Sequence, residues 1–197
     1  IGGYNSLIEK QKKEEGEAYI STVLFDDKVE ILHDRVSLDA VKPMTDKEYY
    51  VRGCTALLDA VGDAIHHIGN VHKYARDEDR PEKILFIITT DGQENSSRKY
   101  SYERVQHMVK RQQERFGWEF LFLGANIDAV CEAGKFGIRA DRAVNYECDR
   151  VGTEINYQVL SRAVSRIRAC ESASAMQEAL VGWDEEIRDD YANRHMK

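Results

Sequence analysis

The sequence has few of the features that mark disordered or membrane-spanning proteins. It contains only two prolines in 197 residues and no low-complexity run, which argues against long disordered segments. No apolar stretch approaches the roughly 18 residues that a membrane-spanning helix needs. What remains, 42% hydrophobic and 32% charged residues, is typical of a soluble globular protein with one full core.

Cysteine is also sparse, and no two cysteines are close in sequence. Without a C-x-x-C pair, neither a zinc ribbon nor a thioredoxin-like site is indicated. We expect these thiols to be reduced and mainly packed, which favours a cytoplasmic location. The four positions are Cys54, Cys131, Cys148 and Cys170.

The net charge of −7 speaks against nucleic acid as the main partner and is compatible with cation binding. The sequence has neither a G-x-G-x-x-G nor a G-x-x-x-x-G-K-[ST] phosphate-binding motif. His66, His67 and His72 are close together, but no glutamate spaces them as in H-E-x-x-H, so we expect surface histidines.

One stretch dominates the sequence. The run Ile84–Thr89 is apolar, too short for a helix, and typical of a strand buried on both faces of a parallel sheet. Thr90-Asp91-Gly92 follows, and Gly92 permits a sharp turn. Asp91 therefore lies at the carboxyl end of a strand, where such sheets place their ligands. At this stage Asp91 is either a ligand or a turn cap.

The alternation of strands and helices predicts an α/β fold, a doubly wound, Rossmann-like and mostly parallel sheet with helices on both faces. A hairpin at the start adds one antiparallel edge pair. We expect one domain over 1–168 and a charged C-terminal helix or tail over 169–197. The expected strands are 18–25, 29–33, 84–89, 118–123 and 143–145, and the expected helices are 1–14, 55–74, one from 101, 126–135 and 153–168.

A second polar position belongs with Asp91. Thr55 precedes the apolar stripe of a helix, at its expected N-cap, and both residues should lie at the same rim of the sheet. A hydroxyl and a carboxylate are hard oxygen donors that suit Mg²⁺ or Mn²⁺. Asp59 either supports this site or is a solvated helix residue, and we expect the latter.

Two segments carry a family resemblance. Gly53-Cys54-Thr55-Ala56-Leu57-Leu58-Asp59-Ala60 and Ile84–Gly92, in this order of elements, resemble the von Willebrand factor type A domain over about Ile1–Tyr146. The chain looks most like bacterial stand-alone members, through segments such as Phe120-Leu121-Phe122-Leu123-Gly124-Ala125-Asn126. The resemblance implies a metal-ion-dependent adhesion site in which Thr55 and Asp91 are metal ligands.

The family's third ligand group, an Asp-x-Ser-x-Ser loop after the first strand, has no counterpart in this sequence. That strand and loop would precede Ile1, and we expect the parent protein to carry them; the alternative is a product that lacks them. The resemblance implies binding rather than catalysis, with an Asp or Glu of a partner protein completing the coordination of Mg²⁺ or Mn²⁺. In this chain alone, metal binding should be weak or absent.

Two other functions remain open at this stage. One is a metal-independent assembly scaffold on the same fold, and the other is a nucleotide-dependent enzyme on a Rossmann-like fold.

Overall fold

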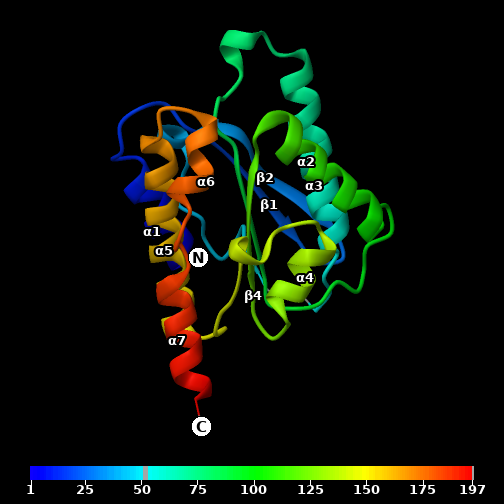
Figure 1. Ribbon diagram of the computed structural model, residues 1–197, viewed down its shortest axis with the longest axis vertical. Coiled ribbons are helices and arrows are strands. Elements are labelled where there is room, and N and C mark those ends of the chain that lie inside the picture. Colours follow the sequence, from blue (N-terminus) through cyan, green and yellow to red (C-terminus); the bar gives the residue numbers. More distant parts are fainter. Residues whose placement is uncertain (51–52, 197) are drawn as a thin grey trace.

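The computed structural model of the chain describes residues 1–50 and 53–196. The strands lie between two layers of helices (Figure 1). One layer consists of α1 (Gly2–Gln11), α5 (Arg150–Ala169), α6 (Met176–Ala179) and α7 (Glu185–His195). The other consists of α2 (Leu57–Tyr74), α3 (Tyr102–Phe116) and α4 (Ala129–Lys135). Short 3-10 turns occur at Leu38–Ala40, Asp77–Asp79, Ala140–Arg142 and Ala173–Ala175.

The strands form two sheets. β1 (Tyr19–Phe25) and β2 (Val29–Ser37) are an antiparallel hairpin, and β3 (Leu85–Thr90), β4 (Glu119–Gly124) and β5 (Ala143–Asn145) are parallel in that order. The predicted α/β class and the antiparallel hairpin are confirmed. Among the described residues no ladder joins β1 to β3, so a single doubly wound sheet stays a prediction.

β3 and β4 differ in burial although both are apolar. β4 is hydrogen-bonded on both sides and is buried at every position. β3 is bonded to β4 alone, and only Ile88 and Thr90 are buried. The prediction of a strand buried on both faces therefore describes β4 well, and β3 only in part, because one edge of β3 has no neighbouring strand in the described chain.

Each helix layer packs on the parallel sheet through its own hydrophobic core. The first core lies under α2, α3 and α4, and the second under α5, α6 and α7. Phe122 and Phe136 belong to the first, and Leu121 and Trp183 to the second. Successive β4 residues alternate between the two cores, as expected for a strand with helices on both faces.

Local capping explains where two of the helices begin. The Ser101 hydroxyl accepts a hydrogen bond from the Arg104 N–H at 3.3 Å at the start of α3. The Asp128 carboxylate does the same for the Cys131 N–H at 2.9 Å at the start of α4. The predicted cap of α2 is wrong: its N-cap is Ala56 rather than Thr55, and Ala56 has no side chain that accepts a hydrogen bond.

The segment after residue 169 contributes to the second core. Leu180, Trp183 and Ile187 are buried, whereas Val181 is 71% exposed. The Trp183 indole N–H donates to the Asp141 carbonyl at 3.1 Å, which joins this segment to the turn before β5. None of the helices in the described chain has the length and apolarity needed to cross a bilayer.

Candidate functional site

The candidate site lies at the carboxyl end of β3. Asp91 follows the strand and is exposed, and the turn after it is closed by the buried Thr90 hydroxyl, which donates to the Gly92 carbonyl at 2.9 Å. Gly92 faces Thr55 so closely that an added Cβ would lie 3.2 Å from the Thr55 Oγ1. Thr55 and the residue beside Asp91 are therefore neighbours although 36 positions separate Thr55 from Asp91.

The backbone of Thr55 is fixed by the loop that follows Asp91. The Thr55 N–H donates to the Asn95 Oδ1 at 2.9 Å, and the Thr55 carbonyl accepts from the Asn95 N–H at 3.0 Å. The Ser96 N–H donates to the same carbonyl at 3.3 Å. These bonds hold Thr55 against the loop from both sides, so the position of its hydroxyl is set by the loop rather than by α2.

Glu94 performs the capping that Thr55 was expected to perform. Its carboxylate accepts from the Leu58 N–H at 2.8 Å, in the first turn of α2, and from the Ser97 hydroxyl at 2.7 Å. The Ser97 hydroxyl in turn accepts from the Asp59 N–H at 3.0 Å. Two N–H groups at the start of α2, which no residue within the helix can satisfy, are thus bonded by the loop.

Asp59 is buried, so the interpretation of a solvated helix residue is wrong. Its carboxylate accepts hydrogen bonds from three consecutive backbone N–H groups, those of Arg98, Lys99 and Tyr100, at 2.9, 2.9 and 3.1 Å. Burial alone would raise the pKa of Asp59, but these bonds and the charge of Lys99 outweigh burial and lower the pKa below its usual value. Asp59 therefore anchors the far end of the loop of residues 91–100, which we call the rim loop.

The neighbours of Asp91 include Asn126, Tyr49 and Cys148. Asn126, which has a left-handed backbone with φ of 58°, donates its side-chain N–H to the Asp91 carbonyl at 3.3 Å. Burial, followed by the charge of Asp91, raises the pKa of both Tyr49 and Cys148. The Cys148 thiol thus stays protonated at neutral pH, which makes it a poor nucleophile.

Thr55 and Asp91 have the type of ligand atom that a hard cation prefers, but two ligands are too few to hold such an ion firmly. Both offer oxygen, and within the described chain the Asp91 carboxylate has no hydrogen bond or ion pair that would compete for it. No cluster of three or more His, Cys, Asp or Glu side chains suited to a metal occurs among residues 1–50 and 53–196. Thr55 and Asp91 could therefore supply only part of the oxygen ligands of a metal site.

The three histidines that the sequence places close together have separate structural contacts. His66 is hydrogen-bonded to Asn70 at 2.9 Å, one turn along α2. His67 reaches Asp34 of β2 at 2.9 Å, and the His72 ring meets the Trp118 ring edge-on. The three side chains therefore have three different partners.

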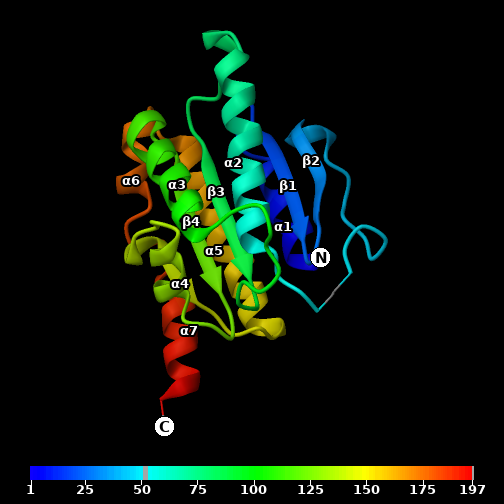
Figure 2. The ribbon, with the colours of Figure 1, turned by 90° about the vertical axis from the view of Figure 1, so that its right-hand side faces the viewer.

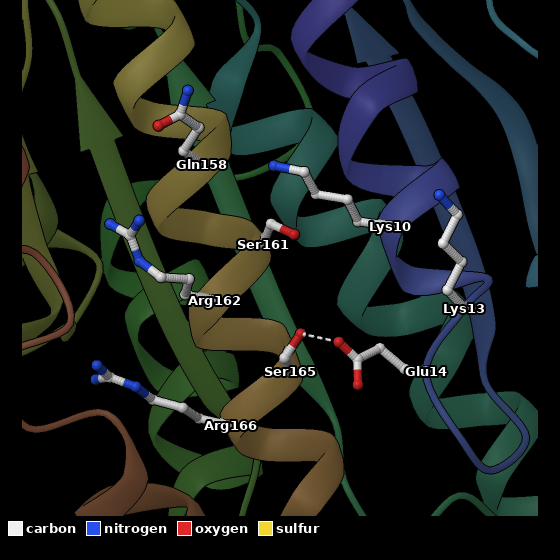
Figure 3. A pocket seen from close by; sticks show the side chains of 8 residues that line it. All are labelled: Lys10, Lys13, Glu14, Gln158, Ser161, Arg162, Ser165 and Arg166. Atoms are coloured by element: carbon white, nitrogen blue, oxygen red, sulfur yellow. Dashed lines mark hydrogen bonds between the residues drawn. The ribbon is translucent and has the colours of Figure 1, made fainter.

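A hollow of about 630 Å³ lies elsewhere, between α1 and α5 (Figure 3). Arg162 and Arg166 extend from the side of α5 that faces away from α1, whereas Glu14 points to Ser165, whose hydroxyl donates to it at 2.8 Å. Arg162 is also paired with Glu186 at 2.6 Å. The cationic groups of this hollow therefore do not converge on one anion. Its lining residues are Lys10, Lys13, Glu14, Gln158, Ser161, Arg162, Ser165 and Arg166.

No family model, curated protein or solved structure matches the chain. The resemblance to the von Willebrand factor type A domain therefore rests on the sequence segments and the order of elements given above.

Sequence reasoning missed Glu94, whose partners lie 36 residues away at Leu58 and beside it at Ser96 and Ser97. The available signal was indirect. A helix that starts after Gly53-Cys54-Thr55-Ala56 with an alanine at its N-cap needs an acceptor from elsewhere. Glu94 lies in the loop that already carries Asp91, and a carboxylate there satisfies the helix end.

Proposed function

We propose that this chain is a protein-interaction module of the von Willebrand factor A type, which acts by binding and not by catalysis. Its recognition surface is the rim where Thr55 and Asp91 meet. A Mg²⁺ or Mn²⁺ ion at these two residues joins the module to an Asp or Glu side chain of a partner protein. The doubly wound arrangement of the two sheets is part of the same proposal.

The observation that carries the proposal is the close approach of Thr55 to Gly92, the residue that follows Asp91. Thr55 precedes α2, and Asp91 follows β3, yet the Cβ position at Gly92 is 3.2 Å from the Thr55 hydroxyl. A glycine at position 92 allows this approach, because a larger residue would press on the hydroxyl. Such convergence at the carboxyl ends of parallel strands is typical of ligand sites in α/β proteins.

In the proposed site, Thr55 and Asp91 supply two oxygen ligands, and water fills the remaining positions. When bound, the ion offers an exchangeable position to a carboxylate of the partner. The protein keeps the two ligands in place: Asn95 fixes Thr55, and Asn126 holds the backbone of Asp91. Two ligands hold an ion weakly. We therefore expect a dissociation constant on the order of 10⁻³ M, which is weaker than that of dedicated metal sites.

One observation favours a second candidate, a metal-independent assembly scaffold. The described chain contains no group of three acidic, histidine or cysteine side chains that would hold an ion firmly. In that case the rim loop contacts its partner through Asp91 and the neighbouring polar side chains without an ion.

The experiment is Mn²⁺-induced line broadening in amide NMR spectra of the full chain, which detects weak binding. We expect the signals of Thr55 and Gly92 to broaden first. Asp91→Asn removes the carboxylate charge and should abolish the local broadening. With Mg²⁺ present, acetate, which stands for the partner's carboxylate, should shift the same signals.

The matched control is Asp77→Asn, which removes an acid whose side chain is 94% exposed, in the 3-10 turn after α2. This variant should behave like the parent protein. Broadening that persists unchanged in Asp91→Asn, or that centres on other residues, would contradict the metal site. Acetate shifts that do not need Mg²⁺ would favour the metal-independent scaffold.

A further inference from the structure

α3 carries three arginines along one side of its exposed surface. Arg104, Arg111 and Arg115 are all exposed and are separated by seven and four positions. An α-helix turns by roughly 100° per residue, so these spacings place the three side chains within an arc of about 40°. With a rise of about 1.5 Å per residue, the row is about 16 Å long. We call these three residues the arginine stripe of α3.

The arginine stripe lies beside the seam between α2 and α3, which Figure 2 shows next to each other on one face of the sheet. The Arg104 guanidinium lies over the Tyr100 ring, 4.7 Å from its centre. A Cβ at Gly62 of α2 would lie 2.6 Å from the same ring, so Tyr100 fills the seam at this level. Further along, a Cβ at Gly69 of α2 would lie 3.4 Å from the Gln112 side-chain nitrogen. The stripe therefore borders a closed seam between two helices.

The charges of the arginine stripe are not neutralised by neighbouring acids. Within the part of the chain that the structure describes, none of the three arginines has an acidic partner. Elsewhere on the surface, Arg80 is paired with Asp77 at 2.8 Å. Arg162 is likewise paired with Glu186 at 2.6 Å. In a chain with a net charge of −7, the stripe is therefore a local concentration of positive charge that attracts anionic groups.

The acids around the stripe limit the shape of the anion that it can bind. Glu103 and Glu114 of α3 are also exposed, and helical spacing places them roughly 60–120° around the helix axis from the arginines. Across the seam, the Asp63 carboxylate of α2 accepts from the Lys99 ammonium at 2.8 Å. A broad anionic surface, such as a membrane or a nucleic-acid duplex, would meet the two glutamates as well as the arginines. A narrow rod with carboxylates along one side can meet the arginines alone.

We propose that the arginine stripe binds an acidic α-helix of a partner protein, which lies along the seam between α2 and α3. The stripe requires carboxylates at positions i, i+4 and i+11 of an antiparallel helix, or i, i+7 and i+11 of a parallel one. Each guanidinium is a planar fork that can pair with a carboxylate through two N–H groups. The inference does not depend on the metal proposed at Thr55 and Asp91.

The test is an NMR titration of the full chain with the peptide Ala-Glu-Ala-Ala-Gln-Glu-Ala-Ala-Glu-Ala-Ala-Gln-Glu-Ala-Ala. Its glutamates lie on one side of a helix and contain both required spacings. The amide and side-chain Nε–Hε signals of Arg104, Arg111 and Arg115 should shift. Binding should weaken as the ionic strength rises from about 0.01 M to about 0.15 M, because the Debye length falls from about 30 Å to about 8 Å.

A peptide of the same composition and charge tests the requirement for one acidic side. In Ala-Glu-Ala-Glu-Ala-Ala-Gln-Ala-Glu-Ala-Glu-Ala-Ala-Gln-Ala the glutamates lie on two opposite sides of a helix. It should bind more weakly than the first peptide, because only two of its carboxylates can face the stripe at once.

Two matched variants test the location. Arg111→Glu should weaken binding of the first peptide by about threefold to tenfold, because an ion pair is lost and a like-charge contact replaces it. The same variant should gain affinity for a peptide with lysine in place of the four glutamates, which a misfolded chain would not do. Arg166→Glu changes the net charge equally at an exposed position of α5 and should bind the first peptide like the parent protein.

An absence of shifts at the stripe would overturn the proposal, as would equal binding of the two glutamate peptides or an equal loss in Arg111→Glu and Arg166→Glu. A short DNA duplex, and vesicles of phosphatidylserine and phosphatidylcholine, serve as competing probes. Tighter binding of either one than of the first peptide would assign the stripe to a polyanion and overturn the assignment to a partner helix.

Discussion

The Glu94 carboxylate caps α2 by accepting the Leu58 N–H at 2.8 Å, across 36 positions of the sequence. The same carboxylate accepts from the backbone N–H groups of Ser96 and Ser97 at 2.9 and 2.8 Å. One side chain thus fixes both the start of the helix and the turn of the loop. The rim between Thr55 and Asp91 is built as one unit with α2.

We expect Glu94→Gln to destabilise the protein by about 1–2 kcal/mol, as the loss of a helix cap does. Glutamine keeps the size of the side chain, but it has one acceptor oxygen in place of two and turns an amide donor toward backbone donors. Urea unfolding measures the effect. The control is Glu82→Gln, an exposed residue in the loop before β3, and an equal loss in both variants would show that Glu94 has no capping role.

The lowered pKa of Asp59 predicts the direction in which the free energy of unfolding changes with pH. Its folded-state pKa lies below the ordinary 3.8, so the unfolded chain binds the proton more tightly than the folded protein does. The stability that Asp59 contributes is therefore present above about pH 3.8 and lost as the pH falls through the lower, folded-state pKa. Asp59→Asn should lower the free energy of unfolding by about 1–3 kcal/mol at neutral pH, because buried donors lose their charged acceptor.

Unfolding free energies measured between about pH 2 and about pH 7 test this sign. The parent should lose stability more steeply than Asp59→Asn at the acidic end. Asp39→Asn, which changes an exposed acid, should follow the parent to within about 0.5 kcal/mol. Parallel curves for the parent and Asp59→Asn would contradict the anchoring role.

Two glycines of α2 should respond in opposite directions to alanine. A Cβ at Gly62 would lie 2.6 to 2.7 Å from the Tyr100 ring, so we expect Gly62→Ala to destabilise by about 1–3 kcal/mol despite the better helix propensity of alanine. A Cβ at Gly69 would meet only the Gln112 side-chain nitrogen, at 3.4 Å. Gly69→Ala should stabilise by up to about 1 kcal/mol. Thermal unfolding of both variants provides the measurement, and a stabilising Gly62→Ala would refute the close packing on Tyr100.

The C-terminal segment should prove to be part of the core. Ile187 is 2% exposed in α7, and truncating such a residue typically costs about 2–5 kcal/mol. Ile187→Ala should therefore lower the urea midpoint strongly, whereas Val181→Ala, at an exposed position of the same segment, should change it little. If Ile187→Ala had the same urea midpoint as the parent, residues 169–197 would be a tail that does not contribute to the stability of the protein.

The sequence predicts the local features well and the long-range polar contacts poorly. Apolar periodicity is sufficient for β4 and the helices, and the Asp128 cap depends on a residue three positions away. The interpretation of Asp59 as a solvated residue and the prediction of Thr55 as a helix cap are wrong for the same reason. The donors to Asp59 lie 39 to 41 positions along the chain, and the group that caps α2 in place of Thr55 is Glu94, far away in sequence. Local spacing carries no information about such partners.

The anchoring of the rim loop by Asp59 and Glu94 has a kinetic consequence. Three consecutive N–H groups at one end and the Glu94 carboxylate at the other leave the loop little freedom before any partner arrives. A partner that binds this rim loses little free energy in ordering it. Association should then proceed in a single phase whose rate rises linearly with partner concentration, without the plateau that a slow loop rearrangement would impose.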